Sequence, residues 1–205
     1  MTGRREHWES VYASRAPTDV SWHQDTPASS LTLIEHCDVG PTGAILDVGG
    51  GASRLVDHLL DGGYLDVTVL DISATALAHA KQRLGARATG VRWIEGDVTT
   101  VELAGPYDVW HDRAAFHFLG DPDDRARYLA QLERALRPHG HVVVATFALD
   151  GPERCSGLPV ARYSPETLAR ELGPSLALVE TWDEDHLTPG GKRQRFVFCR
   201  FRHAA

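Results

Sequence analysis

The sequence predicts an α/β fold in which a mostly parallel sheet carries helices on both faces. Strand-like apolar runs alternate with helical patterns between residues 44 and 147, the arrangement from which parallel sheets are built. The first two runs each end in an acid, Asp47 and Asp71, and a glycine turn follows the first. Because ligands in such sheets bind beyond the carboxyl ends of the strands, the functional site is expected at this edge.

The elements are expected in a simple order along the chain. Short helices at 4–14 and 28–37 flank an irregular segment at 17–27. Strands are expected at 44–48, 65–70, 91–95, 107–111 and 141–147, followed by an antiparallel hairpin of 177–182 and 194–201. Helices are expected at 53–60, which Gly62 and Gly63 end, from the Ser73 cap to 84, from Pro122 to 137, and at 164–172.

The glycine turn argues against a dinucleotide cofactor. In a G-x-G-x-x-G fingerprint counted from Gly49 and Gly51, the third glycine position is occupied by Arg54, a long cation where close packing needs a small residue. Asp47 would also repel a pyrophosphate. S-adenosylmethionine carries a sulfonium and an ammonium but no phosphate, so a nearby carboxylate attracts it. A nicotinamide oxidoreductase is therefore disfavoured.

The pattern Asp47-x-Gly49-x-Gly51-x-Ser53 resembles motif I of class I S-adenosylmethionine-dependent methyltransferases. The resemblance implies a Rossmann-like doubly wound sheet of seven strands in the order 3-2-1-4-5-7-6, with S-adenosyl-L-methionine as cofactor and S-adenosyl-L-homocysteine as product. It also implies that Asp71 holds both ribose hydroxyls and that Asp97 accepts from the adenine amine, since a carboxylate accepts two hydrogen bonds. The residues expected to bind the cofactor are Trp22, Asp47, Gly49, Gly50, Gly51, Ser53, Arg54, Asp71, Ile72, Asp97, Val98 and Asp112.

A second stretch is similar to the fourth-strand motif of thiopurine methyltransferases and of bacterial and plant thiol or halide methyltransferases. In that group a Trp-x-Asp-Arg element leads into a Pro-x-x-Arg helix, and here the residues are Trp110-His111-Asp112-Arg113 and Pro122-Asp123-Asp124-Arg125. The aromatic residues Trp8, Tyr12 and Trp22 are also similar to that group, in which an aromatic segment covers the bound cofactor. Trp22 and Gln24 are the expected lid. The resemblance implies a small-molecule acceptor, with a thiol as one candidate.

Three residues near the fourth strand, Asp112, Arg113 and His117, are the candidates for catalysis. A histidine can position or deprotonate an acceptor, and an arginine can hold an anionic group. Both readings have alternatives that stay open at this point: His117 could pack as an ordinary core side chain, and Arg113 could pair with a neighbouring acid. The residues expected to contact the substrate are Arg113, His117, Arg162 and Tyr163.

The nature of the acceptor is less determined than that of the cofactor. A competing similarity is to small lysine methyltransferases of the citrate-synthase type, which carry Asp-Lys-Gly where this chain has Asp112-Arg113-Ala114. Arg113 favours the small-molecule group. A thiol already supplies some thiolate at neutral pH, whereas a lysine amine must first lose a proton. A protein lysine methyltransferase and a non-catalytic S-adenosylmethionine-binding protein remain the alternative functions.

Composition limits the remaining possibilities. With 205 residues, 42% of them hydrophobic, the chain suits one domain, in which a helical lid segment (1–40) packs on a methyltransferase domain (41–205). A net charge of −7 disfavours nucleic-acid binding, and no apolar run reaches the ~18 residues of a membrane helix. Three widely spaced cysteines indicate neither a disulfide framework nor a metal site, so no metal is expected and the cytoplasm is the expected compartment. The oligomeric state is left open.

Overall fold

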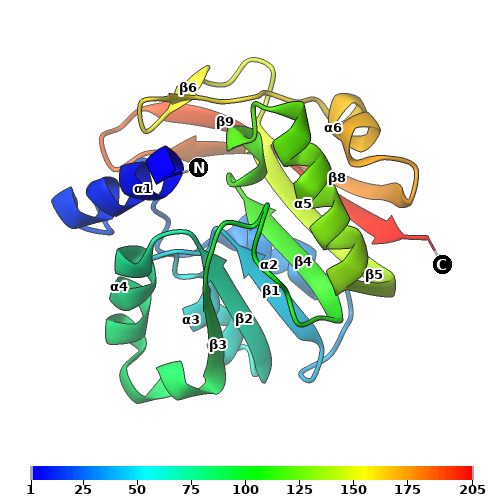
Figure 1. The fold of residues 1–205 in the computed structure, drawn as a ribbon, viewed down its shortest axis with the longest axis horizontal. Helices are drawn as coiled ribbons and strands as arrows, with labels where there is room; N and C mark the ends of the chain where they lie inside the picture. Colours follow the sequence, from blue (N-terminus) through cyan, green and yellow to red (C-terminus); the bar gives the residue numbers. More distant parts are fainter. Residues whose placement is uncertain (1, 205) are drawn as a thin grey trace.

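One seven-stranded sheet forms the centre of a computed structural model that describes residues 2–204 (Figure 1). The strand order is β3 (Val91–Glu95), β2 (Asp66–Asp71), β1 (Ala44–Val48), β4 (Tyr107–Arg113), β5 (Leu136–Phe147), β9 (Arg193–His203) and β8 (Leu176–Leu187). The first five of these pair in parallel, and β9 runs antiparallel to both of its neighbours. The predicted fold class is confirmed.

Two short strands, β6 (Arg154–Cys155) and β7 (Leu158–Pro159), pair only with each other and were not expected. Because β6 and β7 come earlier in the chain, the last two strands of the main sheet are numbered β8 and β9. Counted within the sheet alone, the observed order is the expected 3-2-1-4-5-7-6.

Helices cover both faces of the sheet (Figure 1). One face packs against α2 (Ala28–Glu35), α3 (Leu55–Asp61) and α4 (Ala74–Leu84), and the other against α5 (Pro122–Ala135) and α6 (Pro165–Leu172). Alternation along β1 explains how one strand serves both layers: Ile45 points to the first face, and Leu46 and Val48 point to the second. None of the described helices is long and apolar enough to cross a bilayer.

Local signals place several helix ends where the sequence predicted them. The Ser73 side chain accepts from the backbone N–H of Ala76 at the start of α4, and Gly62 caps the end of α3. At α6, Ser164 and Thr167 form a reciprocal capping box. The bonds at the starts of α4 and α6 satisfy N–H groups that would otherwise have no partner in the first helical turn.

Other boundaries differ from the expectation. Helix α3 starts at Leu55 instead of 53, because the glycine turn uses the residues before it. Strand β4 continues through Asp112 and Arg113, which pair with Val144 and Ala145 of β5. The final hairpin is longer than predicted, since pairing continues to Leu187 opposite Arg193; the charged residues of β8 obscured its alternation.

The two helices within the N-terminal forty residues lie in different places. Helix α1 (Thr2–Ser14) lies over the carboxyl ends of the strands, where its side chains share a cavity with theirs. Helix α2 belongs to the core instead, with Leu33 and Ile34 fully buried. The division into a lid segment at 1–40 and a domain at 41–205 stays a prediction, and its end positions 1 and 205 lie outside the described residues.

Candidate active site

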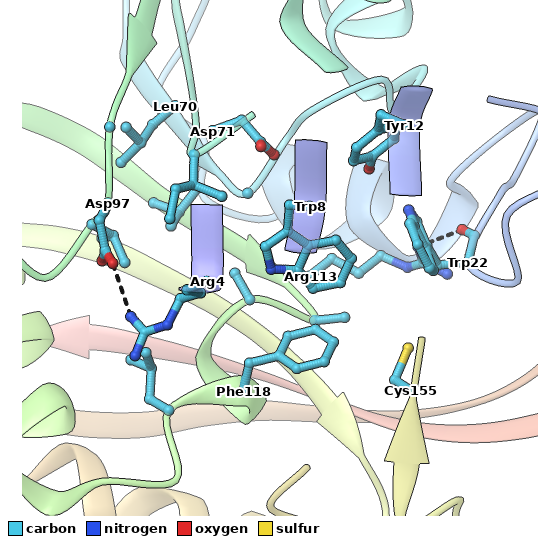
Figure 2. A pocket seen from close by; sticks show the side chains of 18 of the residues that line it. Arg4, Trp8, Tyr12, Trp22, Leu70, Asp71, Asp97, Arg113, Phe118 and Cys155 are labelled. Carbon is cyan, nitrogen blue, oxygen red and sulfur yellow. Dashed lines mark hydrogen bonds and ion pairs between the residues drawn. The ribbon is translucent and has the colours of Figure 1, made fainter. Parts of the chain in front are cut away.

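A cavity with about 850 Å³ of empty space, including its mouth, opens at the carboxyl ends of β1, β2, β3 and β4 (Figure 2). We call it the main cavity. The sequence-predicted residues on its wall are Trp22, Gly49, Asp71, Ile72, Asp97, Val98 and Arg113. Helix α1 lies over it and adds Arg4, Trp8 and Tyr12. The site is therefore built from the sheet edge below and the N-terminal helix above.

The glycine turn after β1 lets the backbone approach its neighbours closely. Gly49 and Gly51 have φ values of +68° and +45°, which L side chains rarely adopt. A Cβ at Gly49 would stand 2.7 Å from the Cβ of Ala115, and one at Gly51 would stand 2.8 Å from the Oδ2 of Asp71. The turn is anchored because the N–H groups of Gly49 and Gly50 both donate to the carbonyl of Leu70, at 2.8 and 3.2 Å.

Asp71 ends β2 at the wall of the main cavity. Its Oδ1 accepts from the backbone N–H of Ser73 at 2.8 Å, and its Oδ2 faces Gly51, where no side chain stands. Burial raises the pKa of Asp71 to about 7, and the charges of Asp47 and Glu9 add to this. Hydroxyl groups of a ligand that donate hydrogen bonds to this buried carboxylate would stabilise its charged form.

Asp97 follows β3 and is fully engaged. Its Oδ1 accepts from the N–H of Thr99 at 2.9 Å and from the Thr99 hydroxyl at 2.7 Å. Its Oδ2 accepts from Nη1 of Arg4 at 2.9 Å, the contact marked in Figure 2. Sequence reasoning missed Arg4, although the i, i+4, i+8 spacing of Arg4, Trp8 and Tyr12 places them on one helix face.

A smaller, adjoining cavity shares Trp22, Gly49 and Arg113 with the main one. The predicted cofactor residues Asp47, Gly50 and Ser53 lie on its wall. Asp47 is buried and accepts from Nδ1 of His111 at 2.8 Å, while Nε2 of the same ring lies 2.9 Å from the Ser30 hydroxyl. His111 and Ser30 were not predicted as site residues.

The predicted cofactor residues Gly51, Arg54 and Asp112 line neither cavity. Gly51 lies beneath Asp71 and the Tyr12 hydroxyl. Arg54 is at the surface, where it pairs with Asp25 at 2.9 Å. The predicted contact of these residues with the cofactor stays a prediction.

The structure does not bring Asp112 to either cavity. Alternation along β4 turns this side chain toward α5, on the opposite face from Asp47, and its surface is fully buried. The carboxylate accepts from the N–H groups of Ala115 and Phe116 and from the Tyr128 hydroxyl at 2.9 Å. Burial raises its pKa to about 6. These contacts shape the turn after β4, so the geometry does not support the expected catalytic role.

His117 is also placed away from the wall of the main cavity. Its ring is fully buried, with centroids 4.5 Å from Phe118 and 4.9 Å from Phe147. Neither ring nitrogen has a hydrogen-bond partner in the part of the chain that the structure describes. Burial lowers its pKa to about 3, with the Arg113 charge as a second cause. Of the two readings left open by the sequence, these contacts favour packing.

Arg113 lies on the wall of the main cavity, and its side chain runs toward Trp22 (Figure 2). Its Nη1 donates to the Trp22 carbonyl at 2.9 Å, and its guanidinium lies 5.0 Å from the centre of the Phe196 ring. Among the described residues, Nε and Nη2 have no hydrogen-bond partner, with Glu184 at 3.9 Å. Arg113 thus offers two unused donors in an aromatic surrounding.

The loop after β5 contributes a different residue from those predicted. Arg162 donates to the Gly151 carbonyl at 3.1 Å and pairs with Glu153, and Tyr163 packs in the hydrophobic core near Phe116. Neither lines the main cavity, so their predicted contact with a substrate has no support in this geometry. Cys155 lines it instead, and burial raises the pKa of its thiol to about 11.

The predicted lid residues lie between the two cavities and the final hairpin. Trp22 packs edge-to-face against Trp8 and Tyr12, with ring centroids 5.7 and 6.1 Å apart. Gln24 donates to Glu184 of β8 at 2.8 Å. The lid is therefore held by α1 on one side and by β8 on the other.

Comparisons with known proteins agree on one kind of chemistry. A family model described as "Methyltransferase domain" matches residues 45–140. The chain is 30% identical over 184 residues to a Mycolicibacterium paratuberculosis protein named "Putative O-methyltransferase", covering 86% of this chain and 77% of that protein. It is also 30% identical over 147 residues to the Danio rerio eEF1A lysine and N-terminal methyltransferase, covering 70% of this chain. The chain spans only 21% of the length of that relative.

Solved structures give the same fold. One of the most similar is the N-methyltransferase NodS from Bradyrhizobium japonicum in complex with S-adenosyl-L-homocysteine, with a TM-score of 0.73 and 19% identity. The match covers 96% of this chain and 98% of that chain. At this level of identity the likeness shows a shared fold and does not extend to the substrate.

Proposed function

Because the chain belongs to the class I S-adenosylmethionine-dependent methyltransferases, we propose that its methyl acceptor is a small anionic molecule with an apolar body. S-adenosylmethionine supplies an electrophilic methyl group when bound, and the neutral thioether S-adenosylhomocysteine leaves. The main cavity fits this cofactor, since the Asp71 carboxylate on its wall can accept hydrogen bonds from hydroxyl donors. The thiopurine and thiol subgroup is one source of such acceptors.

The observation that carries the proposal is the buried guanidinium of Arg113. Nε–H and Nη2–H make no hydrogen bond among the described residues, the carboxylate of Glu184 stands 3.9 Å from Nη2, and the side chain is only 12% exposed. An unpaired buried donor is unfavourable, and a charged one is more so. A carboxylate or thiolate on the acceptor would satisfy these donors with charge-assisted bonds. Phe118, Phe147 and Phe196 on the same wall suit an apolar or aromatic body.

A protein lysine is the second candidate acceptor, and the eEF1A lysine methyltransferases among the relatives favour it. Two features of the site argue against it. The Arg113 guanidinium would repel a lysine ammonium at this end of the cavity. Helix α1 also covers the site, with Trp8 packed edge-to-face on Phe118 at a centroid distance of 5.0 Å.

The test measures formation of S-adenosylhomocysteine with matched acceptor pairs. Each pair contains an aromatic thiol or amine that bears a carboxylate and the corresponding neutral amide; lysine-rich peptides complete the panel. We expect turnover with the carboxylates. Arg113→Gln should reduce kcat/KM for the anionic member of a pair about 10- to 100-fold, which corresponds to the loss of one hydrogen bond to a charged group. The kcat/KM for the neutral member should change little. Arg113→Lys should retain part of the preference.

Results of the opposite kind would reject the small anionic acceptor. These are turnover only with peptide lysines, or equal loss for both members of each pair in Arg113→Gln. Cofactor affinity, measured by calorimetry in every variant, separates an effect on the acceptor from an effect on the cofactor.

A further inference from the structure

Arg4 reaches from α1 into the main cavity and bridges two acids. Its Nη1 donates to Oδ2 of Asp97 at 2.9 Å, and its Nη2 donates to Oδ2 of Asp124 at 2.5 Å. Asp97 follows β3, whereas Asp124 lies in the first turn of α5. Figure 2 shows the Arg4 guanidinium directed at Asp97 on the cavity wall. One side chain therefore ties the covering helix to both sides of the cavity.

The contact with Arg4 leaves Asp97 without a free oxygen. Oδ1 is held by the N–H and hydroxyl of Thr99, within the same turn, and Oδ2 is held by Arg4. The Asp97 and Asp124 side chains are only 13% and 12% exposed, so water competes weakly for these bonds. A ligand amine that approaches Oδ2 of Asp97 would therefore compete with the Arg4 guanidinium for this oxygen.

The other polar contacts of α1 go to α4 and β3. Glu9 accepts from the Thr75 hydroxyl at 2.5 Å at the start of α4, and His79 of α4 lies 3.3 Å from the Tyr12 carbonyl. Arg5 pairs with Glu95 of β3 at the surface. Among the ion pairs of α1 in the described part of the chain, only the pair of Arg4 with Asp124 reaches α5. Release of Arg4 from Asp97 would thus free this carboxylate oxygen, while the contacts of α1 with α4 and with Asp124 stay in place.

We propose that Arg4 is a latch that competes with the adenine amine of the cofactor for Asp97. The contacts of Arg4 with Asp97 and Asp124 hold α1 over the main cavity. The cofactor enters when Arg4 leaves Asp97, and the bond to Asp124 keeps the helix within reach so that the cover can close again. The proposal rests on the cofactor binding in this cavity with its adenine amine at Asp97, the contact that the resemblance implies; it does not depend on the identity of the methyl acceptor.

The experiment compares Arg4→Gln with Arg5→Gln. Arg5 is a matched control, because it is the next residue of the same helix and also pairs with an acid, but at the surface. S-adenosylhomocysteine association is followed by stopped-flow tryptophan fluorescence, to which Trp8 and Trp22 on the cavity wall contribute. We expect Arg4→Gln to raise the association rate about 5-fold or more, the range for losing a partly buried charged pair, and Arg5→Gln to leave it unchanged.

A second measurement tests the named partner. In an Asp97→Asn background, Arg4→Gln should give no further increase in association rate, because the two residues act through one contact. Circular dichroism spectra and melting curves establish that each variant is folded. The latch is rejected if Arg4→Gln associates no faster than the wild type, if Arg5→Gln speeds association equally, or if no variant binds S-adenosylhomocysteine. Failure of the acceptor proposal alone would leave all these rates unaffected.

Discussion

Nδ1 of His111 lies 2.8 Å from Oδ1 of Asp47, where the two residues are paired neighbours on the parallel strands β1 and β4. The other ring nitrogen lies 2.9 Å from the hydroxyl of Ser30 at the start of α2. All three side chains are buried. This chain of bonds fixes the Asp47 carboxylate beside the glycine turn and joins the turn to the core helix behind it.

His111→Leu should destabilise the protein by about 3 kcal/mol, because it leaves a buried carboxylate without its side-chain partner. Removing the acid as well, in the Asp47→Leu/His111→Leu double variant, should recover part of this loss, since replacing both partners of a buried pair by apolar groups is close to neutral. Urea unfolding of both variants measures the difference. Additive losses in the double variant would show that the two side chains do not act as a pair.

Asp71→Ala should weaken the binding of S-adenosylmethionine by about 1–3 kcal/mol, the cost of leaving ligand donors without their acceptor. Asp66→Ala is the matched control, because Asp66 begins the same strand and lies outside both cavities. Calorimetry on both variants gives the affinities. An unchanged affinity in Asp71→Ala would mean that the ribose is held elsewhere.

The sheet edge and its acids were predictable because they depend on local patterns. Apolar runs that end in Asp47 and Asp71, with positive-φ glycines between them, specify strand ends and a tight turn from the sequence alone. Asp97 followed from the same resemblance. The structure places all three acids on cavity walls, but what each of them binds stays a prediction.

The direction of the side chains beyond β4 was not predictable in the same way. Asp112 and His117 lie within six residues of each other in a segment whose path depends on how far the strand continues. Because β4 continues for two residues beyond its expected end, the Asp112 side chain points toward Tyr128. The His117 ring is buried because the chain then forms a 3₁₀ turn, η2 (Phe116–Phe118). The Arg4 bridge was hidden for a different reason: its partners Asp97 and Asp124 lie 93 and 120 residues away in sequence.

The stability of the ligand-free protein should carry an unusual pH dependence from Asp71. Burial raises the pKa of this carboxyl to about 7 in the folded state, above its value of about 4 in an unfolded chain. The folded state therefore binds more protons between these values, so this contribution is fully present below pH ~4 and is lost as the pH rises through about 7. Asp71→Asn should abolish it. Melting temperatures measured from pH 5 to pH 8 for both proteins test this, and parallel curves would contradict it.

His117→Leu should preserve turnover. Its effect on the pH dependence of stability should be opposite in direction to that of Asp71→Asn. The folded-state pKa of His117 is lowered to about 3 by burial, so its contribution is fully present above the unfolded value of ~6.5 and is lost as the pH falls toward 3. Leucine cannot take up a proton and suits the contacts with Phe118 and Phe147, so the variant should lose less stability than the wild type between pH 7 and pH 5. An unpartnered imidazole replaced by an apolar side chain should leave the stability at pH 7.5 within about 1 kcal/mol of the wild type. Steady-state assays decide the catalytic question: a large fall in kcat with unchanged cofactor affinity would restore His117 as a base or positioning group for the acceptor, whereas normal kcat assigns the ring to packing.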